Sequence, residues 1–225
     1  MIMTNLESSS FVSSHVVNPS IDDLDAILSP ACNLALWKRP TSPAPIAIQE
    51  LVNSPFQSLQ LVYDRSQPID IIGAYFDEHL SLKAVDAYPL FSDIMTIAKK
   101  FVSLCSDKVI GIRLERITND NCKSFHIDYL SLRLICTYWG AATEWLENSN
   151  VNREGLGQNR NDLVWKNEDD IKQFKTSWVG VLKGENYEGN SGNGVVHRSP
   201  QIADLKNADR ILLRMDTLER FGSHK

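Results

Sequence analysis

The sequence has few cysteines, no long apolar run and no excess of positive charge. Among its 225 residues there are 4 cysteines. None stands in a CxxC pair, so reduced thiols are expected rather than a disulfide framework. No apolar stretch approaches the ~18 residues that a membrane-spanning helix requires. The 23 Lys and Arg residues are outnumbered by 28 Asp and Glu residues, giving a net charge of −5. This balance disfavours nucleic acid or an anionic membrane as a partner.

The first twenty residues contain no Lys or Arg, and Glu7 is their only charged residue. They therefore lack the basic start of a secretory signal and the Arg-rich face of a transit peptide. A cytoplasmic protein is the resulting prediction. This stretch is rich in Ser and has no helical or strand period. We therefore expect residues 1–19 to form a flexible arm before a single domain over residues 20–225.

Periodicity divides that domain into a helical part, residues 20–106, and a β part, residues 107–225. Apolar residues recur at helical spacing in four segments of the first part: 21–28, 46–53, 70–87 and 90–105. In the second part, alternation as in VIGIRLERIT predicts a strand at 109–118. The same criteria predict further strands at 123–128, 132–138, 142–146, 176–183, 194–198 and 210–216.

This distribution predicts the α+β fold class. Several short strands over roughly 110 residues suit a jelly roll, in which two antiparallel sheets pack together. We expect the helical N-terminal half to pack on one sheet of this C-terminal jelly roll. A generic α+β domain without a barrel is the alternative.

Two histidines and an aspartate form the main candidate for a chemical site. His126 and Asp128 are two residues apart, so on a strand they share a face at a spacing of about 6.6 Å. His197 lies on a separate predicted strand and can complete a set of two imidazoles and one carboxylate. Such a facial triad holds non-haem Fe(II) and leaves positions for a bidentate co-substrate and dioxygen. Zn(II) can take the same ligands, and the sequence does not decide between the metals.

Arginines on the last predicted strand are candidate anion ligands. Arg210 follows His197 by 13 residues and can hold a co-substrate carboxylate with its fork of donors. Arg214 shares its face on a regular strand and is the reserve. A solvent-facing position is the alternative for both. Tyr138 and Arg133, on the predicted strand 132–138, are further candidates for cofactor binding, and a position in the core is the alternative for Tyr138.

Cys122 raises the question of a four-ligand zinc site. Four residues of extended strand would separate it from His126 by about 13 Å, too far for one ion. We therefore expect Cys122 to be a buried structural thiol.

The order and spacing of these residues resemble the double-stranded β-helix (cupin-like) oxygenases that use Fe(II) and 2-oxoglutarate. The stretch WVGVLKGENYEGNSGNGVVHRSP at 178–200 looks like that superfamily's strand, Gly-rich loop and distal histidine. A closer match covers residues 30–216. NLALWKR, IRLERI, CKSFHIDYLSLRLICTYWGAATEWL, LKGE, VHRSP and RILLRMD resemble the bacterial domain-of-unknown-function family 1826. Trp139 stands where that family usually has an arginine, and the family implies no established activity.

The sequence as a whole predicts an oxygenase of the Fe(II)/2-oxoglutarate type with an unknown substrate. Fe(II) would bind His126, Asp128 and His197, and Arg210 would pair with the far carboxylate of 2-oxoglutarate. One alternative is a non-catalytic zinc- or iron-binding protein of metal homeostasis on the same triad. The other is a scaffold whose triad is vestigial. The oligomeric state is not indicated.

Overall fold

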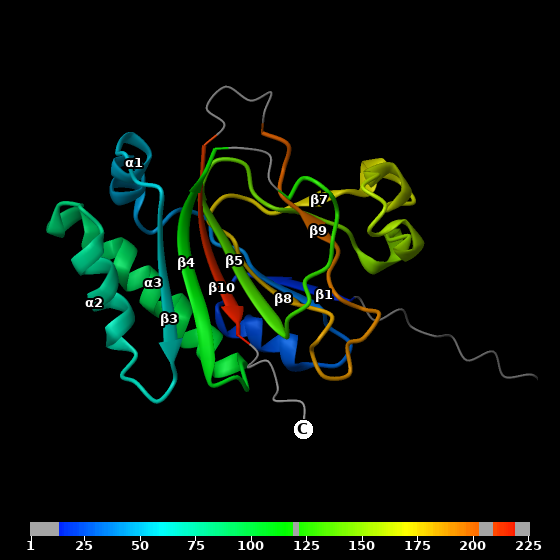
Figure 1. Ribbon diagram of the computed structural model, residues 1–225, viewed down its shortest axis with the longest axis horizontal. Helices are drawn as coiled ribbons and strands as arrows, with labels where there is room; N and C mark the ends of the chain where they lie inside the picture. Colours follow the sequence, from blue (N-terminus) through cyan, green and yellow to red (C-terminus); the bar gives the residue numbers. More distant parts are fainter. Residues whose placement is uncertain (1–13, 119–121, 203–208, 219–225) are drawn as a thin grey trace, which may run out of the picture.

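The computed structural model describes residues 14–118, 122–202 and 209–218 (Figure 1). The strands of its larger sheet are β1 (His15–Asn18), β2 (Leu34–Trp37), β3 (Ser58–Asp64), β4 (Val109–Ile117), β5 (Leu132–Trp139), β8 (Val179–Lys183) and β10 (Arg210–Thr217). These seven strands are ordered β1-β2-β8-β5-β10-β4-β3. The smaller sheet consists of β6 (Glu144–Trp145), β7 (Lys172–Gln173) and β9 (His197–Arg198), ordered β7-β6-β9. Only the β1–β2 pair is parallel among the described strand pairs.

The main helices lie on one face of the larger sheet (Figure 1). They are the 3-10 helix η1 (Asp22–Leu28) and the α-helices α1 (Pro45–Asn53), α2 (Asp70–His79) and α3 (Ala84–Leu104). Four short 3-10 helices follow β6, namely η2 (Asn148–Asn150), η3 (Arg153–Gly155), η4 (Asn161–Leu163) and η5 (Glu168–Asp170). Within the described part of the chain, no helix is long and apolar enough to cross a membrane.

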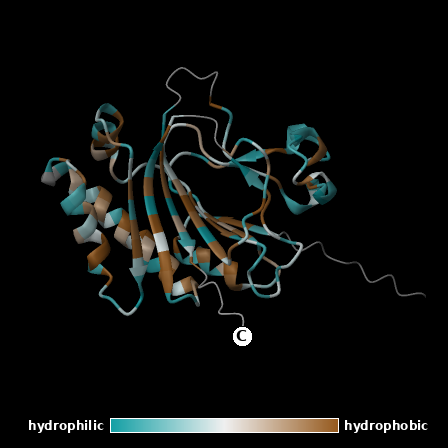
Figure 2. Cartoon of the chain, viewed as in Figure 1, coloured by the Kyte–Doolittle hydropathy of each residue, from teal (hydrophilic) through white to brown (hydrophobic). Residues whose placement is uncertain are grey.

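Strand alternation gives the larger sheet two different faces. On β10, Ile211, Leu213 and Met215 belong to the core that the helices cover. Leu212, between them, belongs to a second core, which also contains Trp145 of β6. Successive side chains on a strand point to opposite faces, so the smaller sheet packs on the face away from the helices. The strands of the larger sheet are correspondingly rich in hydrophobic residues, with polar ones interspersed (Figure 2).

The predicted helical N-terminal half is not confirmed, because this part of the chain also supplies β1, β2 and β3. Residues 1–13 lie outside the described residues, and β1 occupies most of the rest of the predicted arm, 1–19. Pairing with β2 places β1 at the sheet edge. Both strands are short, and periodicity does not assign short apolar runs to helix or strand. The helix predicted over 70–87 is divided, since α2 ends at His79 and α3 begins at Ala84.

A buried ion pair between Arg39 and Asp93 links α3 to the end of β2, and Tyr138 of β5 also contacts Asp93. Nη1 of Arg39 donates to Oδ1 of Asp93 at 2.5 Å, and the Tyr138 hydroxyl donates to Oδ2 of Asp93 at 2.6 Å. Burial raises the pKa of Tyr138 well above its usual value, so this phenol keeps its proton. Tyr138 thus faces the helices, and its predicted place in the pocket is wrong. Its neighbours on β5 show why: Leu134 and Cys136 share its face and belong to the same core.

Replacing Asp93 with Ala is expected to lower the free energy of unfolding by about 3–5 kcal/mol, because Arg39 would remain buried without its partner. Urea unfolding followed by circular dichroism measures the change. Glu78→Ala is the control: the Glu78 side chain is 78% exposed, so we expect an effect within about 0.5 kcal/mol. Equal losses in the two variants would contradict a stabilising role for the buried pair.

Candidate metal centre and its cavity

The two histidines of the predicted triad are brought together by the backbone. His126 and His197 form an isolated antiparallel bridge in which each backbone N–H donates to the other residue's carbonyl at 3.0 Å. The predicted strand 123–128 is otherwise absent. Because residues opposite each other in such a bridge project to the same side, the imidazole centroids lie 4.6 Å apart.

Asp128 completes the cluster. Its Oδ2 lies 3.4 Å from Nε2 of His197, and its Oδ1 lies 3.8 Å from Nε2 of His126. One ligand atom from each of the three residues lies within 4.8 Å of the others. The structure therefore brings all three sequence-predicted ligands to one point.

Backbone carbonyls orient both imidazoles. Nδ1 of His126 is 3.0 Å from the carbonyl of Ser124, and Nδ1 of His197 is 3.1 Å from the carbonyl of Val195. A carbonyl only accepts hydrogen bonds, so each Nδ1 carries a proton, which leaves Nε2, on the side of Asp128, as the nitrogen that can bind a metal. Burial lowers the pKa of His197 to about 4, which keeps this imidazole neutral at pH 7. Neutral imidazole is the form that binds metals.

Asp128 offers a free carboxylate oxygen. Burial by itself would raise its pKa, but the neighbouring His197 and Arg133 hold that pKa below its usual value. Its Oδ1 accepts a hydrogen bond from Nη1 of Arg133 at 2.6 Å, whereas its buried Oδ2 has no hydrogen-bond partner in the described part of the chain. A buried acceptor without a partner costs about 1–3 kcal/mol, and a metal ion would satisfy it. Two neutral imidazoles and one carboxylate fit a divalent transition metal.

Arg133 lines the cavity, but its guanidinium is already paired with carboxylates. Besides Asp128, it holds Asp216 of β10 through Nε–Oδ1 at 2.6 Å and Nη2–Oδ2 at 3.2 Å. The geometry therefore makes Arg133 a residue that positions Asp128. Sequence reasoning missed Asp216, although the period of two places it on the same face of β10 as Arg210 and Arg214.

Replacing Arg133 with Met is expected to weaken metal binding by about 10- to 100-fold, the usual effect of losing a group that orients a ligand. Titration of the metal-free protein with Fe(II) under anaerobic conditions measures this affinity. Arg160→Gln is the control, since Arg160 is paired with Asp162 and its side chain is 63% exposed. An unchanged Fe(II) affinity in Arg133→Met would show that Asp128 binds the metal without being positioned by Arg133.

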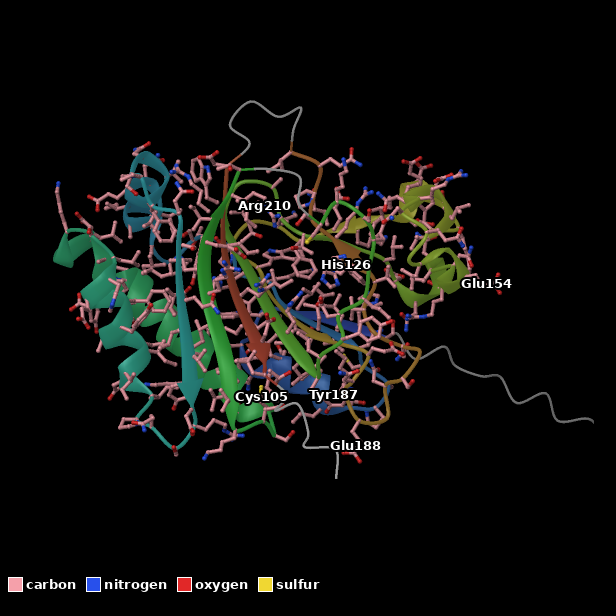
Figure 3. All side chains as sticks on the ribbon, in the orientation of Figure 1. Cys105, His126, Glu154, Tyr187, Glu188 and Arg210 are labelled. Atoms are coloured by element: carbon pink, nitrogen blue, oxygen red, sulfur yellow. The ribbon has the colours of Figure 1, made fainter. Side chains whose placement is uncertain are left out.

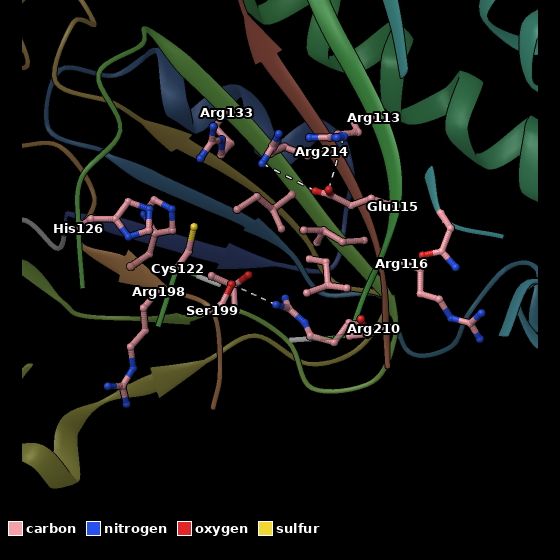
Figure 4. A pocket seen from close by; sticks show the side chains of 17 residues that line it. Arg113, Glu115, Arg116, Cys122, His126, Arg133, Arg198, Ser199, Arg210 and Arg214 are labelled. Atoms are coloured by element: carbon pink, nitrogen blue, oxygen red, sulfur yellow. Dashed lines mark hydrogen bonds and ion pairs between the residues drawn. The ribbon is translucent and has the colours of Figure 1, made fainter. Parts of the chain in front are cut away.

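A cavity of about 430 Å³ opens beside the two histidines. His126, Cys122, Arg198, Ser199 and Arg210 lie around it in Figure 4. At the level of the whole molecule, Arg210 and His126 lie away from Cys105 and Tyr187, which are at the other end of the larger sheet (Figure 3). The cavity is thus formed between the two sheets and on the face that carries no helices.

Arg210 is buried in this cavity wall without a carboxylate partner among the described residues. It is 1% exposed; Nη1 donates to Oγ of Ser199 at 3.3 Å and Nη2 donates to Oγ1 of Thr137 at 3.5 Å. Its Nε has no partner. Desolvation lowers the pKa of Arg210 to about 10, so it remains charged at pH 7. A buried, charged and unpaired guanidinium is suited to receiving an anion.

Arg214, the reserve candidate, is already paired. Its Nε lies 3.1 Å from Oδ2 of Asp216, and its Nη1 lies 3.7 Å from Oε1 of Glu115. The contact with Glu115 is drawn in Figure 4. Neither of these two carboxylates was identified from the sequence as a partner. Arg214 therefore lines the cavity without the free guanidinium that Arg210 has.

The prediction that Cys122 is buried is wrong. Cys122 is exposed, lines the cavity and has a φ of 62°. The left-handed backbone conformation shows that the chain turns here, whereas the prediction assumed a continuous strand up to His126. Arg198 forms an ion pair with Glu144, with Nε 2.6 Å from Oε2.

Comparisons with known proteins identify the family of this chain and a fold that it shares with solved structures. The family model "Protein of unknown function (DUF1826)" matches residues 18–216. The chain belongs to DUF1826. No curated protein matches this DUF1826 chain.

Among solved structures, the dioxygenase for auxin oxidation 1 from Arabidopsis thaliana, bound to 2-oxoglutarate, is similar. It has a TM-score of 0.54 and 10% sequence identity, and 93% of each chain is covered. The dioxygenase for auxin oxidation from rice has a TM-score of 0.50 and 14% identity, covering 92% of this chain and 83% of that one. At such low identities these likenesses show a shared fold alone.

Proposed function

We propose that this DUF1826 chain is an Fe(II)- and 2-oxoglutarate-dependent oxygenase whose two sheets form a jelly roll. One observation carries the proposal: the triad, with its free Asp128 oxygen, and the unpaired guanidinium of Arg210 line the same cavity. A divalent metal and a dicarboxylate co-substrate together satisfy both. The shared fold with a dioxygenase that binds 2-oxoglutarate supports this reading.

In this proposal each residue has a defined task. His126, Asp128 and His197 hold Fe(II), and Arg133 fixes the carboxylate of Asp128. Arg210 pairs with the far carboxylate of 2-oxoglutarate. When bound, iron and the keto acid supply the activation of dioxygen.

Ser199 and Thr137 hold the guanidinium of Arg210 through their hydroxyls. These are neutral partners, so they orient the guanidinium without cancelling its charge. Burial excludes water from the guanidinium, which strengthens its attraction for a carboxylate. Arg210 is thus prepared for a dicarboxylate before the co-substrate arrives.

Anaerobic titration of the metal-free protein with Fe(II) and then 2-oxoglutarate tests the proposal. We expect a visible charge-transfer band that develops only when both are present, because it requires the keto acid to chelate the bound iron. Succinate, which has two carboxylates but no keto group, is the control and is expected to give no band. Absence of the band with 2-oxoglutarate, despite bound Fe(II), would contradict the proposal.

A zinc- or iron-binding protein of metal homeostasis is the second candidate, because the same three ligands accept Zn(II) and the order of metal affinities favours it over Fe(II). This function leaves the buried charge of Arg210 unexplained. Tight Zn(II) binding together with no effect of 2-oxoglutarate on the metal would favour this candidate.

A further inference from the structure

A ladder of alternating charges crosses the cavity wall from Asp128. Arg133 joins Asp128 to Asp216, with 2.6 Å contacts to both, and Asp216 contacts Nε of Arg214 at 3.1 Å. Arg214 reaches Glu115 at 3.7 Å. These residues come from the neighbouring strands β5, β10 and β4 and from the loop that carries Asp128.

Arg113 of β4 ends the ladder. Its Nε lies 3.4 Å from Oε2 of Glu115, too poorly aligned for a hydrogen bond, and it has no other ion pair in the described part of the chain. Its side chain is 39% exposed, and it lines the same cavity as the triad. Arg113 stands directly opposite Arg214 in the strand register, so two arginines share the carboxylate of Glu115. Nη1 and Nη2 of Arg113 are therefore available to another anion.

The other arginines of the cavity wall lack this freedom. Arg116 lies 2.9 Å from Asp209 and also donates to the carbonyl of Ser54. Arg198 is paired with Glu144. Once Arg210 receives the co-substrate, Arg113 is the least engaged arginine of this wall among the described residues.

The charge balance of the loaded site calls for one more anion. The ladder itself is neutral, because three arginines alternate with three carboxylates. Arg210 and a divalent metal add three positive charges, of which the dianion 2-oxoglutarate cancels two. With both histidines bound as neutral ligands, one positive charge remains on the described residues of the site.

The cavity also offers apolar surface. Ile135 and Leu212 line it together with the arginines. Arg113 and Arg133 lie on β4 and β5, with β10 between them. Two strand spacings therefore separate them laterally by about 10 Å. Because the metal ligands lie beyond Arg133, a molecule that reached from the metal to Arg113 would be at least this long, with an apolar body between its ends.

We propose that Arg113 binds the negatively charged group of the primary substrate, which is a small monoanionic carboxylate with an apolar body. Arg214 supports this role because it also pairs with Glu115, so that carboxylate neutralises Arg113 only in part. The inference rests on the proposed function, since it treats Arg210 and the metal as occupied by the co-substrate.

Calorimetric titration of the protein loaded with Mn(II) and saturating 2-oxoglutarate, without oxygen, tests the inference. The probes are ω-phenylalkanoates from phenylacetate to 5-phenylpentanoate, each compared with its uncharged primary amide. We expect at least one acid to bind about 10- to 100-fold more tightly than its amide, as expected for a charge-assisted hydrogen bond. Arg113→Gln should remove this preference and Arg113→Lys should retain part of it. Arg160→Gln should leave it unchanged.

The outcomes separate this inference from the proposed function. Binding of Mn(II) and 2-oxoglutarate, with no preference for any acid over its amide, would overturn the inference alone. A preference that persists in Arg113→Gln would do the same. Failure of the wild-type protein to bind 2-oxoglutarate in the presence of metal would overturn the proposed function and this inference with it.

Discussion

Replacing His197 with Ala is expected to weaken Fe(II) binding by more than about 100-fold, beyond the effect of losing a residue that only orients a ligand. Nε2 of His197 lies nearest to the free oxygen of Asp128, at 3.4 Å. Without this imidazole, His126 and Asp128 remain as two ligands, too few to hold the metal firmly. We expect the fold to persist, because the bridge to His126 is made by backbone atoms.

Thermal unfolding with and without metal gives a second measurement for this variant. A metal at 100 times its Kd stabilises the wild-type protein by about 2.7 kcal/mol, and His197→Ala should lose this increment. His79→Ala is the matched control, since His79 lies on α2 and contacts Tyr75 and Glu78 rather than the triad. Full metal occupancy in His197→Ala would remove His197 from the metal centre.

Replacing Arg210 with Met is expected to weaken 2-oxoglutarate binding by about 30- to 4000-fold. Losing one partner of a buried charge pair costs about 2–5 kcal/mol. Met fills much of the same volume without a charge. Fe(II) affinity should be retained, because Arg210 contacts none of the three metal ligands. Fluorescence or absorbance titration with 2-oxoglutarate on the Fe(II)-loaded, oxygen-free protein measures the change.

The stability of this variant provides an independent test of the same idea. Arg210 is buried and charged, with only hydroxyl partners in the described structure, so its desolvation is not offset by a carboxylate. We therefore expect Arg210→Met to leave the free energy of unfolding unchanged or to raise it. Arg214→Gln, which breaks two ion pairs, should affect 2-oxoglutarate affinity far less. Equal effects of the two substitutions on that affinity would contradict the distinct role of Arg210.

Local sequence patterns determined much of the candidate site. The HID spacing and the later histidine identified the three residues that the structure brings together. Alternation along β10 placed Ile211, Leu213 and Met215 on one face, as the helix-covered core shows. These features depend on the period of a strand, which neighbouring residues in the sequence express directly.

The tertiary structure alone decided which arginine is free. Arg210 and Arg214 lie on one strand and one face, so alternation along the strand could not show which of them is paired. Glu115 and Asp216 pair with Arg214, whereas Arg210 contacts only hydroxyls among the described residues. Partners on adjacent strands are set by register, which joins residues far apart in the chain.

Short strand length explains why the strands of the N-terminal half were missed, and a distant hydrogen-bond partner explains why Tyr138 was misplaced. β1 and β2 are four residues each, too short for a period to distinguish them from other apolar runs. Tyr138 combines an aromatic ring with a hydroxyl, as residues that line pockets often do. Its hydroxyl donates instead to Asp93, which lies 45 residues earlier on α3. The sequence by itself determined which side chains share a strand face. Only long-range packing decided which face borders the cavity and which charges remain unpaired there, because burial and pairing depend on segments distant in the chain.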